Sequence, residues 1–190
     1  RAKEAGARRV FSGLENTNPD NLASAKKGQK KITEYRKMVI AWKAQGLITV
    51  AGYIRGFPAD TPQTIRRDIA IIQRELPLDG LEFFCLTPLP GSEDHQKLHR
   101  AGVAMEPDLN KYDLNHVTAS HSRMSKEEWE RAYPMAWERY YTMDHIPTIP
   151  RRTPRRRGPD PRGDDRPSTH LQLRAHRSAL RRQLDPAITK

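Results

Sequence analysis

The sequence predicts an α/β fold, a partial parallel (β/α) barrel, and three observations lead to this prediction. Three short apolar runs each end in a turn rich in glycine or proline, and a segment of helical periodicity follows each run. The runs recur about every 35 residues, the length of one β-strand with its crossover helix in a parallel sheet. They are V-F-S-G-L-E-N at 10–16, L-I-T-V-A-G-Y-I-R-G-F-P at 47–58 and L-E-F-F-C-L-T-P-L-P-G at 81–91.

The first unit combines a buried strand at Val10–Leu14, which ends at Glu15, with a helix. The motif N-P-D-N at 18–21 marks a turn between them. We predict that Thr33 caps the helix and that Gly46 ends it, because glycine readily adopts a left-handed conformation. The apolar stripe of this helix consists of Tyr35, Met38, Val39 and Trp42.

The second unit begins with a strand at Leu47–Ile54. Thr61 followed by Pro62 is typical of a helix cap and a first helical turn, and Pro77 ends the helix. The apolar positions recur at helical spacing, which predicts one buried face. They are Ile65, Ile69, Ile72 and Leu76.

The third unit has a strand at Leu81–Leu86 and a helix that begins at Ser92. Beyond it the alternation of strand and helix stops, and residues 103–124 are expected to be irregular. Ser125 and Glu128 form a capping box for a last helix, whose aromatic face is more typical of packing than of a cofactor site. Pro134 falls inside this helix and is expected to kink or interrupt it. The aromatic face consists of Trp129, Tyr133, Trp137, Tyr140 and Tyr141.

We divide the chain into a partial-barrel domain at 1–102, a helical extension at 103–149 and a tail at 150–190 that we expect to be disordered. The tail carries most of the net charge of +11, since 12 basic and 4 acidic residues lie in 151–190 against 22 and 19 in 1–150. Arginine-rich tails bind RNA or DNA through phosphates. No aromatic residue is interleaved here to stack bases, so we do not expect a nucleic-acid partner.

The lone cysteine, Cys85, excludes an internal disulfide framework and suits a reducing, cytoplasmic environment. Neither a signal peptide nor an apolar run long enough to span a membrane is visible. Three parallel strands are too few to close a barrel, and the chain starts at Arg1 rather than Met. We therefore expect a partner that supplies the missing amino-terminal half, either upstream in the same gene or on another chain.

The common catalytic and metal-binding motifs are absent: no Walker loop, G-x-G-x-x-G, H-E-x-x-H or nucleophile elbow occurs. His95 and His99 are spaced i, i+4 on a predicted helix, but they have no third ligand at a recognisable spacing. Cys85 lies inside an apolar strand and is interpreted as a core residue. The sequence thus offers no candidate for a metal ligand or for a catalytic group.

The turns at the strand ends are more informative. Gly52 and Gly56 flank Ile54, where glycine would let a flat ligand approach the backbone closely. Glu15 ends an apolar strand, a costly position unless the carboxylate is hydrogen-bonded or faces a polar pocket. The segment Thr87–Gly91 forms a rigid turn after the third strand. The occurrence of such turns on consecutive units predicts a binding site at this end of the sheet.

The chain here resembles the radical S-adenosylmethionine (radical SAM) enzymes, most closely those associated with cobalamin-binding domains. The resemblance covers about residues 8–145 and rests on four segments. They are F-S-G-L-E-N at 11–16, A-K-K-G-Q-K-K-I-T-E-Y at 25–35, G-Y-I-R-G-F-P-A-D-T at 52–61 and L-T-P-L-P-G-S at 86–92.

The resemblance implies strands four, five and six of a (β/α)6 barrel, followed by helices. In that family the end of strand four contacts the ribose or methionine part of SAM, which implies this role for Glu15. Gly52, Ile54 and Gly56 match the strand-five segment beside the adenine. Leu86 and Thr87 match the end of strand six, whose backbone helps to hold the adenine.

The chain also departs from the family. It lacks the C-x3-C-x2-C loop that binds the 4Fe–4S cluster, the glycine-rich turn that binds the methionine amino group, and any cobalamin-binding segment. Ser12 and Arg55 replace aliphatic residues, and Ala59 stands where many relatives carry Glu. Arg55 in a buried strand is costly unless its side chain reaches water or an anion.

Three hypotheses follow for function. The first is a carboxy-terminal fragment of a radical SAM enzyme, inactive alone, with SAM and a 4Fe–4S cluster as cofactors of the complete enzyme and cobalamin in the parent protein. The second is a degenerate, non-catalytic binding or scaffold domain. The third is an RNA-associated protein that uses its basic tail. The substrate is not identified by the sequence.

Overall fold

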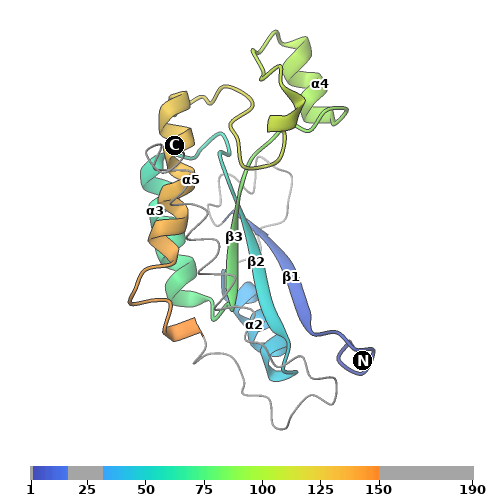
Figure 1. The fold of residues 1–190 in the computed structure, drawn as a ribbon, viewed down its shortest axis with the longest axis vertical. Coiled ribbons are helices and arrows are strands. Elements are labelled where there is room, and N and C mark those ends of the chain that lie inside the picture. The colour runs from blue at the N-terminus through green and yellow to red at the C-terminus, as the bar shows by residue number, and fades with distance from the viewer. Residues whose placement is uncertain (1, 17–31, 150–190) are drawn as a thin grey trace, which may run out of the picture. The chain divides into compact units, whose positions relative to one another are not determined.

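The computed structural model describes residues 2–16 and 32–149, and both stretches belong to one compact unit, Arg1–Thr153 (Figure 1). The turn predicted at 18–21 and the tail predicted at 150–190 lie outside the described residues. No helix among the described residues is long and apolar enough to cross a membrane.

The described residues contain a parallel sheet of three strands in the order β1 (Arg9–Glu15), β2 (Ile48–Arg55) and β3 (Gly80–Cys85). Two helices connect them, α2 (Ile32–Ala44) before β2 and α3 (Pro62–Glu75) before β3 (Figure 1). The predicted α/β class with parallel strands is confirmed. The numbering of these strands as four to six of a barrel stays a prediction.

The register brings the carboxyl ends of the strands to one edge of the sheet. Arg55 at the end of β2 pairs with Cys85 at the end of β3, and Gly13 near the end of β1 pairs with Gly52. A bulge follows, because Glu15 rather than Leu14 pairs with the next residue of β2. We call the residues that end the strands and the turns after them, 13–16, 54–60 and 85–91, the rim.

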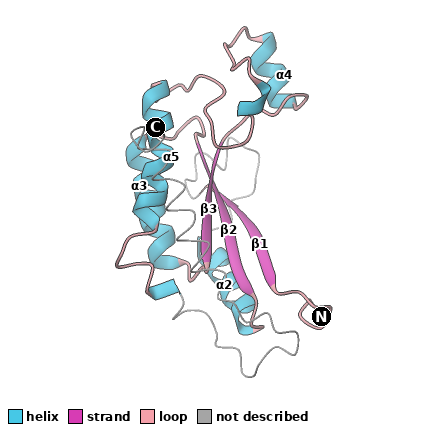
Figure 2. Ribbon diagram, viewed as in Figure 1, coloured by secondary structure: helices cyan, strands magenta, loops and turns pink. Residues whose placement is uncertain are grey.

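One face of the sheet is covered by α3 and α5 (Lys126–Tyr140), which lie side by side (Figure 2). The ring of Phe83 in β3 packs edge-on against Trp137 and Tyr140 of α5, with ring centroids 5.1 and 6.2 Å apart. On the α3 side, Ile65, Ile69 and Ile72 are fully buried. The apolar stripe predicted for α3 and the aromatic face predicted for α5 are therefore core packing. The other face carries Phe11, Gly52, Glu82 and Phe84, and we call it the Phe11 face.

The helix starts follow the sequence signals. Thr61 caps α3, accepting a hydrogen bond from the Thr64 backbone N–H at 3.2 Å, and the Thr64 hydroxyl accepts one from the Thr61 N–H at 2.8 Å. Ser92 caps α4 (Glu93–Arg100), and Ser125 with Glu128 forms the predicted capping box of α5. A short 3₁₀ helix, Leu109–Lys111, lies in the segment that was expected to be irregular.

The prediction for Thr33 is wrong, and of the two alternatives predicted for Pro134, a kink or an interruption, the interruption does not occur. Thr33 is not a cap, because it lies inside α2, whose first described residue is Ile32. Pro134 does not interrupt α5, which is a single helix from Lys126 to Tyr140. Burial of the aromatic face on both sides of Pro134 outweighs the loss of one backbone hydrogen bond.

Candidate functional site

Glu15 is the last residue of β1 and has a left-handed backbone conformation, with φ of 60°. Its side chain folds back over Gly13, since a Cβ atom on Gly13 would lie 3.8 Å from both Cγ and Oε1 of Glu15. The Tyr35 hydroxyl donates a hydrogen bond to the Gly13 carbonyl at 3.3 Å. Burial and then the charge of Glu15 raise the pKa of Tyr35. The bulge thus places a carboxylate at the rim, beside a half-buried phenol.

Gly52 lies in the centre of β2, and the space above it is filled by aromatic rings. A Cβ atom there would lie 2.7 Å from Cζ of Phe11 and 2.9 Å from Cε2 of Phe84. The two rings meet edge to face with centroids 6.4 Å apart. Neighbouring strands therefore explain the glycine, and a flat ligand on this face would lie over Phe11 and Phe84 rather than directly on the Gly52 backbone.

Gly56 opens the turn after β2 with φ of +96°, a conformation that residues with a Cβ rarely adopt. The indole of Trp129 packs onto it so closely that a Cβ atom would lie 2.5 Å from the indole Nε1. The backbone angle and the indole each require glycine. Gly56 thus anchors the start of α5 to the rim.

Asp60 and Asn16 are fully buried, and both form hydrogen bonds with backbone groups at the end of β2 and in the turn after it. Oδ2 of Asp60 accepts hydrogen bonds from the backbone N–H groups of Gly56 at 2.8 Å and Phe57 at 3.0 Å. The Asn16 side-chain amide donates to Oδ1 of Asp60 and to the Ile54 carbonyl, both at 3.4 Å. These bonds join the end of β1 to the turn after β2.

The carbonyl groups of the same turn are bound by three consecutive residues of the irregular segment. Nε2 of His121 lies 2.9 Å from the Phe57 carbonyl oxygen, and the Ser122 hydroxyl donates to the Pro58 carbonyl at 3.2 Å. The Arg123 guanidinium donates to the next carbonyl, that of residue 59, at 3.5 Å. Nδ1 of His121 accepts from the Arg123 backbone N–H, so Nε2 carries the proton. The turn is therefore fixed through both its amides and its carbonyls.

The remaining predicted site residues lie at the same end of the sheet. Ile54, Leu86 and Thr87 are all half-buried. The Leu86 N–H donates to the Arg55 carbonyl at 2.8 Å, which continues the pairing of β2 with the segment after β3. The Thr87 hydroxyl donates to the Cys85 carbonyl at 3.1 Å. The structure thus brings all six predicted residues to β2 and the rim, and their role as SAM contacts stays a prediction.

Arg55 is fully buried at the end of β2 and forms no ion pair within residues 2–16 and 32–149. Its guanidinium donates to the Trp129 carbonyl at 2.7 Å and lies 4.9 Å from the ring centroid of Tyr133. Burial lowers its pKa. Arg55 was expected to reach water or an anion; in the structure it instead ties the end of β2 to α5.

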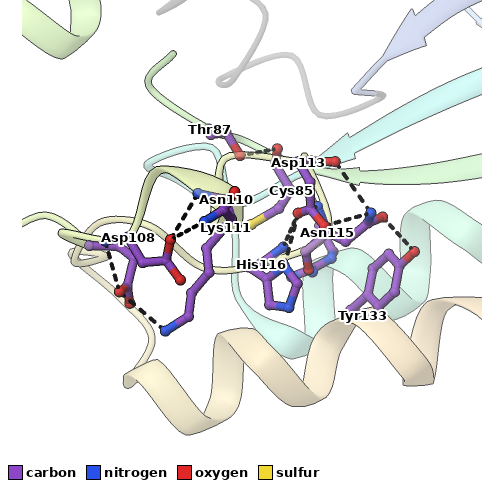
Figure 3. Close-up of polar contacts among 11 residues, drawn as sticks. Cys85, Thr87, Asp108, Asn110, Lys111, Asp113, Asn115, His116 and Tyr133 are labelled. Carbon is purple, nitrogen blue, oxygen red and sulfur yellow. Dashed lines mark hydrogen bonds and ion pairs between the residues drawn. The ribbon is translucent and has the colours of Figure 1, made fainter. Parts of the chain in front are cut away.

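A polar cluster covers the end of β3 (Figure 3). The Tyr133 hydroxyl donates to Oδ1 of Asn115 at 2.8 Å, and Asp113 pairs with His116 at 2.9 Å. Desolvation raises the pKa of Asp113, but hydrogen bonds from His116 and Asn115 outweigh it and lower this pKa to about 2. The carbonyl of Leu114, which lies between Asp113 and Asn115, accepts a hydrogen bond from the Cys85 N–H at 2.6 Å. The cluster consists of surface groups that satisfy one another.

The residues do not fit an iron–sulfur cluster. The chain has one cysteine, and it is buried. Over the described ranges, no group of three or more His, Cys, Asp and Glu side chains is arranged to hold a metal ion. A SAM site fits only in part, because the rim offers the Glu15 carboxylate and half-buried side chains, while aromatic rings of the chain fill the spaces at Gly52 and Gly56.

Sequence reasoning missed Asn16, Asp60, Trp129 and His121 as residues that shape the rim. Asp60 had a signal, since an Asp after a glycine–proline turn is typical of side-chain-to-backbone bonding. The contacts of Trp129 and His121 with the turn at 56–60 span more than 60 residues of sequence, and no local pattern reveals them.

Neither the scan against protein-family models nor the search of curated proteins finds a match to this chain. Among solved structures, the chain is similar to the archaeal Methanocaldococcus infernus Elp3 with an N-terminus deletion (1–46). The identity is 19%, the TM-score is 0.46, and the match covers 53% of this chain. It covers 24% of the Elp3 chain, so this chain spans about a quarter of the length of the structure that it matches.

Proposed function

We propose that this chain is the adenosine-facing part of a radical SAM-type partial barrel. In this proposal the rim binds the adenosine part of SAM, with the Glu15 carboxylate toward the ribose. The segment from Gly52 to Gly56 and the backbone at Leu86–Thr87 lie toward the adenine. A separate segment or chain supplies the cluster cysteines, and the chain alone is catalytically inactive.

One observation carries the proposal: three of the four segments that resemble the radical SAM family, those at 11–16, 52–61 and 86–92, lie where adjacent parallel strands end, whereas most of the fourth, at 25–35, lies outside the described residues. Glu15, the turn at Gly56 and the segment at Leu86 come from three strands that are in register. Ligands of parallel sheets bind at this edge because the loops that follow the strands converge there. A flat heteroaromatic ring can stack on Phe11, which is 54% exposed, beside the half-buried ring of Phe84.

A second candidate function is a non-catalytic binding or scaffold domain, and the glycine sites favour it. The spaces at Gly52 and Gly56 are filled by rings of the same chain. The backbone groups of the turn at 56–60 are bonded to Asp60 and to residues 121–123. Such a rim can persist as a rigid surface after the loss of catalysis.

Ligand-observed saturation-transfer NMR with SAM tests the proposal. We expect the adenine and ribose protons to receive saturation, and the methionine methyl group to receive much less, because the turn that holds the methionine amino group is missing. Glu15→Gln should reduce the effect on the ribose protons, whereas Glu93→Gln, a change at an exposed helix position, should not. Absence of any transfer to adenosine would favour the scaffold domain.

Anaerobic reconstitution with iron and sulfide is the second test. With one buried cysteine, the chain should give no stoichiometric 4Fe–4S absorbance or electron paramagnetic resonance signal. A full cluster, or nanomolar affinity for SAM without a partner, would contradict the proposal that this chain holds only part of the site.

A further inference from the structure

Glu82 is an unusual residue for its position in the sheet. It is the one charged residue of β3, whose sequence is G-L-E-F-F-C, and strands of parallel sheets are ordinarily apolar on both faces. Its side chain lies on the Phe11 face and is exposed. Within residues 2–16 and 32–149, the Glu82 carboxylate forms no hydrogen bond and no ion pair. Glu82 thus offers a free acceptor on the face where the proposed function stacks the adenine.

Protection of a sheet edge does not account for this charge. Charged side chains on edge strands hinder pairing with other chains, but the outer edge of β3 is already occupied. The Tyr141 hydroxyl accepts a hydrogen bond from the Leu81 N–H and donates one to the Leu81 carbonyl, both at 2.8 Å. The Leu114 carbonyl accepts a hydrogen bond from the Cys85 N–H at 2.6 Å. The position of Glu82 therefore calls for another explanation.

Glu82 lies in a row with two glycines. Gly13 pairs with Gly52, and Gly52 pairs with Glu82, so the three residues lie side by side across the sheet. Paired residues of parallel strands point to the same face, because side chains alternate along each strand. Above Gly52 the rings of Phe11 and Phe84 meet, with Phe11 Cζ and Phe84 Cε2 at 2.7 and 2.9 Å from the position of a Cβ atom. The Glu82 side chain therefore stands on the β3 side of these rings.

The β1 end of the same row also carries a carboxylate. The Glu15 side chain folds back over Gly13, and its Cγ and Oε1 atoms each lie 3.8 Å from the position of a Cβ atom there. Neighbouring strands are about 4.8 Å apart, so two strand spacings separate Gly13 from Glu82 by about 10 Å. The Phe11 face thus presents two carboxylates with a pair of phenyl rings between them.

We propose that Glu82 binds the exocyclic amino group of the adenine, an inference that rests on the proposed function. With the ribose at Glu15 and the purine stacked on Phe11, the far edge of the purine points toward β3. A nucleoside, with its sugar and fused rings end to end, has a length that suits the distance between the two carboxylates. The amino group of adenine donates hydrogen bonds, and a carboxylate accepts them. Glu82 therefore selects adenine over purines that lack this donor.

Titrations of the full chain with adenosine and with purine riboside, which lacks only the exocyclic amino group, test this role. Two-dimensional ¹H–¹⁵N spectra give the affinity and the binding position together. We expect adenosine to bind about tenfold more tightly, since a hydrogen bond to a charged acceptor is lost with purine riboside. Glu82→Ala should remove this difference. Glu138→Ala, which removes an equal charge from an exposed position of α5, should keep it.

Glu82→Gln adds a measurement in which binding is gained. Inosine carries an oxygen in place of the amino group, which the Glu82 carboxylate repels and a glutamine amide can bind as a donor. The preference for adenosine over inosine should therefore fall about tenfold in this variant. Equal affinity of the wild type for adenosine and purine riboside, with shift changes at the rim, would overturn the role of Glu82 and leave the proposed function standing. Absence of shift changes with either nucleoside would overturn both.

Discussion

At Gly56 the rim packs directly against α5, because this residue has no side chain. Its φ of +96° and the indole of Trp129 exclude a Cβ atom for separate reasons. Gly56→Ala should lower the free energy of unfolding by about 2–4 kcal/mol, from backbone strain together with overpacking. Gly91→Ala is the matched control, since Gly91 has φ of +86° and no atom within 4 Å of the added Cβ.

Urea denaturation of both variants separates these two causes. Gly91→Ala should cost only the backbone part, about 1 kcal/mol. Equal losses in the two variants would show that the Trp129 contact does not constrain Gly56.

Asp60 is a second residue whose replacement should be costly. Asp60→Ala leaves the buried N–H groups of Gly56 and Phe57 without the carboxylate that they bind. We expect a loss of about 2–4 kcal/mol, since an unsatisfied buried donor costs about 1–3 kcal/mol. Asp60→Asn keeps an acceptor oxygen and should lose less than half of that, as measured by urea denaturation. If Asp60→Ala left the free energy of unfolding unchanged, the turn would be held by residues 121–123 alone.

Cys85 should behave as an inert core thiol. Burial raises its pKa to about 11, although the nearby Arg55 guanidinium lowers it in part. As pH rises from about 8.5, the unfolded thiol loses its proton first, so the folded state retains more protons and stability falls. The advantage of the wild type over Cys85→Ala should therefore shrink by about 2 kcal/mol between pH 8.5 and pH 10.5. An unchanged difference over this range would show that the thiol titrates normally.

At the scale of elements, α5 carries a proline that its packing tolerates. Pro134 lacks the N–H that would bond the Glu130 carbonyl, yet the helix is continuous from Lys126 to Tyr140. Pro134→Ala restores that bond at a half-buried position and leaves the aromatic residues of α5 unchanged. It should raise the free energy of unfolding by about 1–3 kcal/mol, measured by thermal or urea denaturation. A loss of stability would mean that the proline sets the angle at which α5 packs.

The elements themselves were largely predictable, and the exceptions have physical reasons. Strand and helix order follow from apolar runs and caps, as at Thr61 and Ser125, because these signals are local. An interruption at Pro134 does not occur, because tertiary packing of distant aromatic residues overrides a local preference. Thr33 was misplaced because its polar neighbours resemble a cap.

The convergence of the predicted residues on one end of the sheet was predictable, whereas the contacts that each of them makes were not. Glu15, Gly56 and Thr87 follow consecutive apolar strands, and parallel topology alone brings such positions to one edge. Long-range contacts decide what each position does: Trp129 fills the space at Gly56, and Phe84 helps to fill that at Gly52. No spacing in the sequence reveals that the side chain of a distant residue fills the space beside a glycine.

At the scale of the whole molecule, the central claim is that the rim of a three-stranded parallel sheet receives an adenosine group. In the described residues, α3 and α5 cover one face of the sheet, and the rim lies at the carboxyl ends of its strands. The Tyr141 hydroxyl binds the outer backbone groups of β3 at Leu81. A nucleoside approaching the rim meets the Glu15 carboxylate and the rings of the Phe11 face. The binding position, rather than the affinity, therefore distinguishes this account from nonspecific association with an arginine-rich tail.

The most direct measurement is a two-dimensional ¹H–¹⁵N correlation spectrum of the chain during titration with SAM. The account predicts saturable shift changes at the amides of residues 13–16, 52–56 and 86–87, with no comparable change at the opposite ends of the strands. Shift changes confined to residues 150–190, or to the amino-terminal ends of β1, β2 and β3, would contradict it.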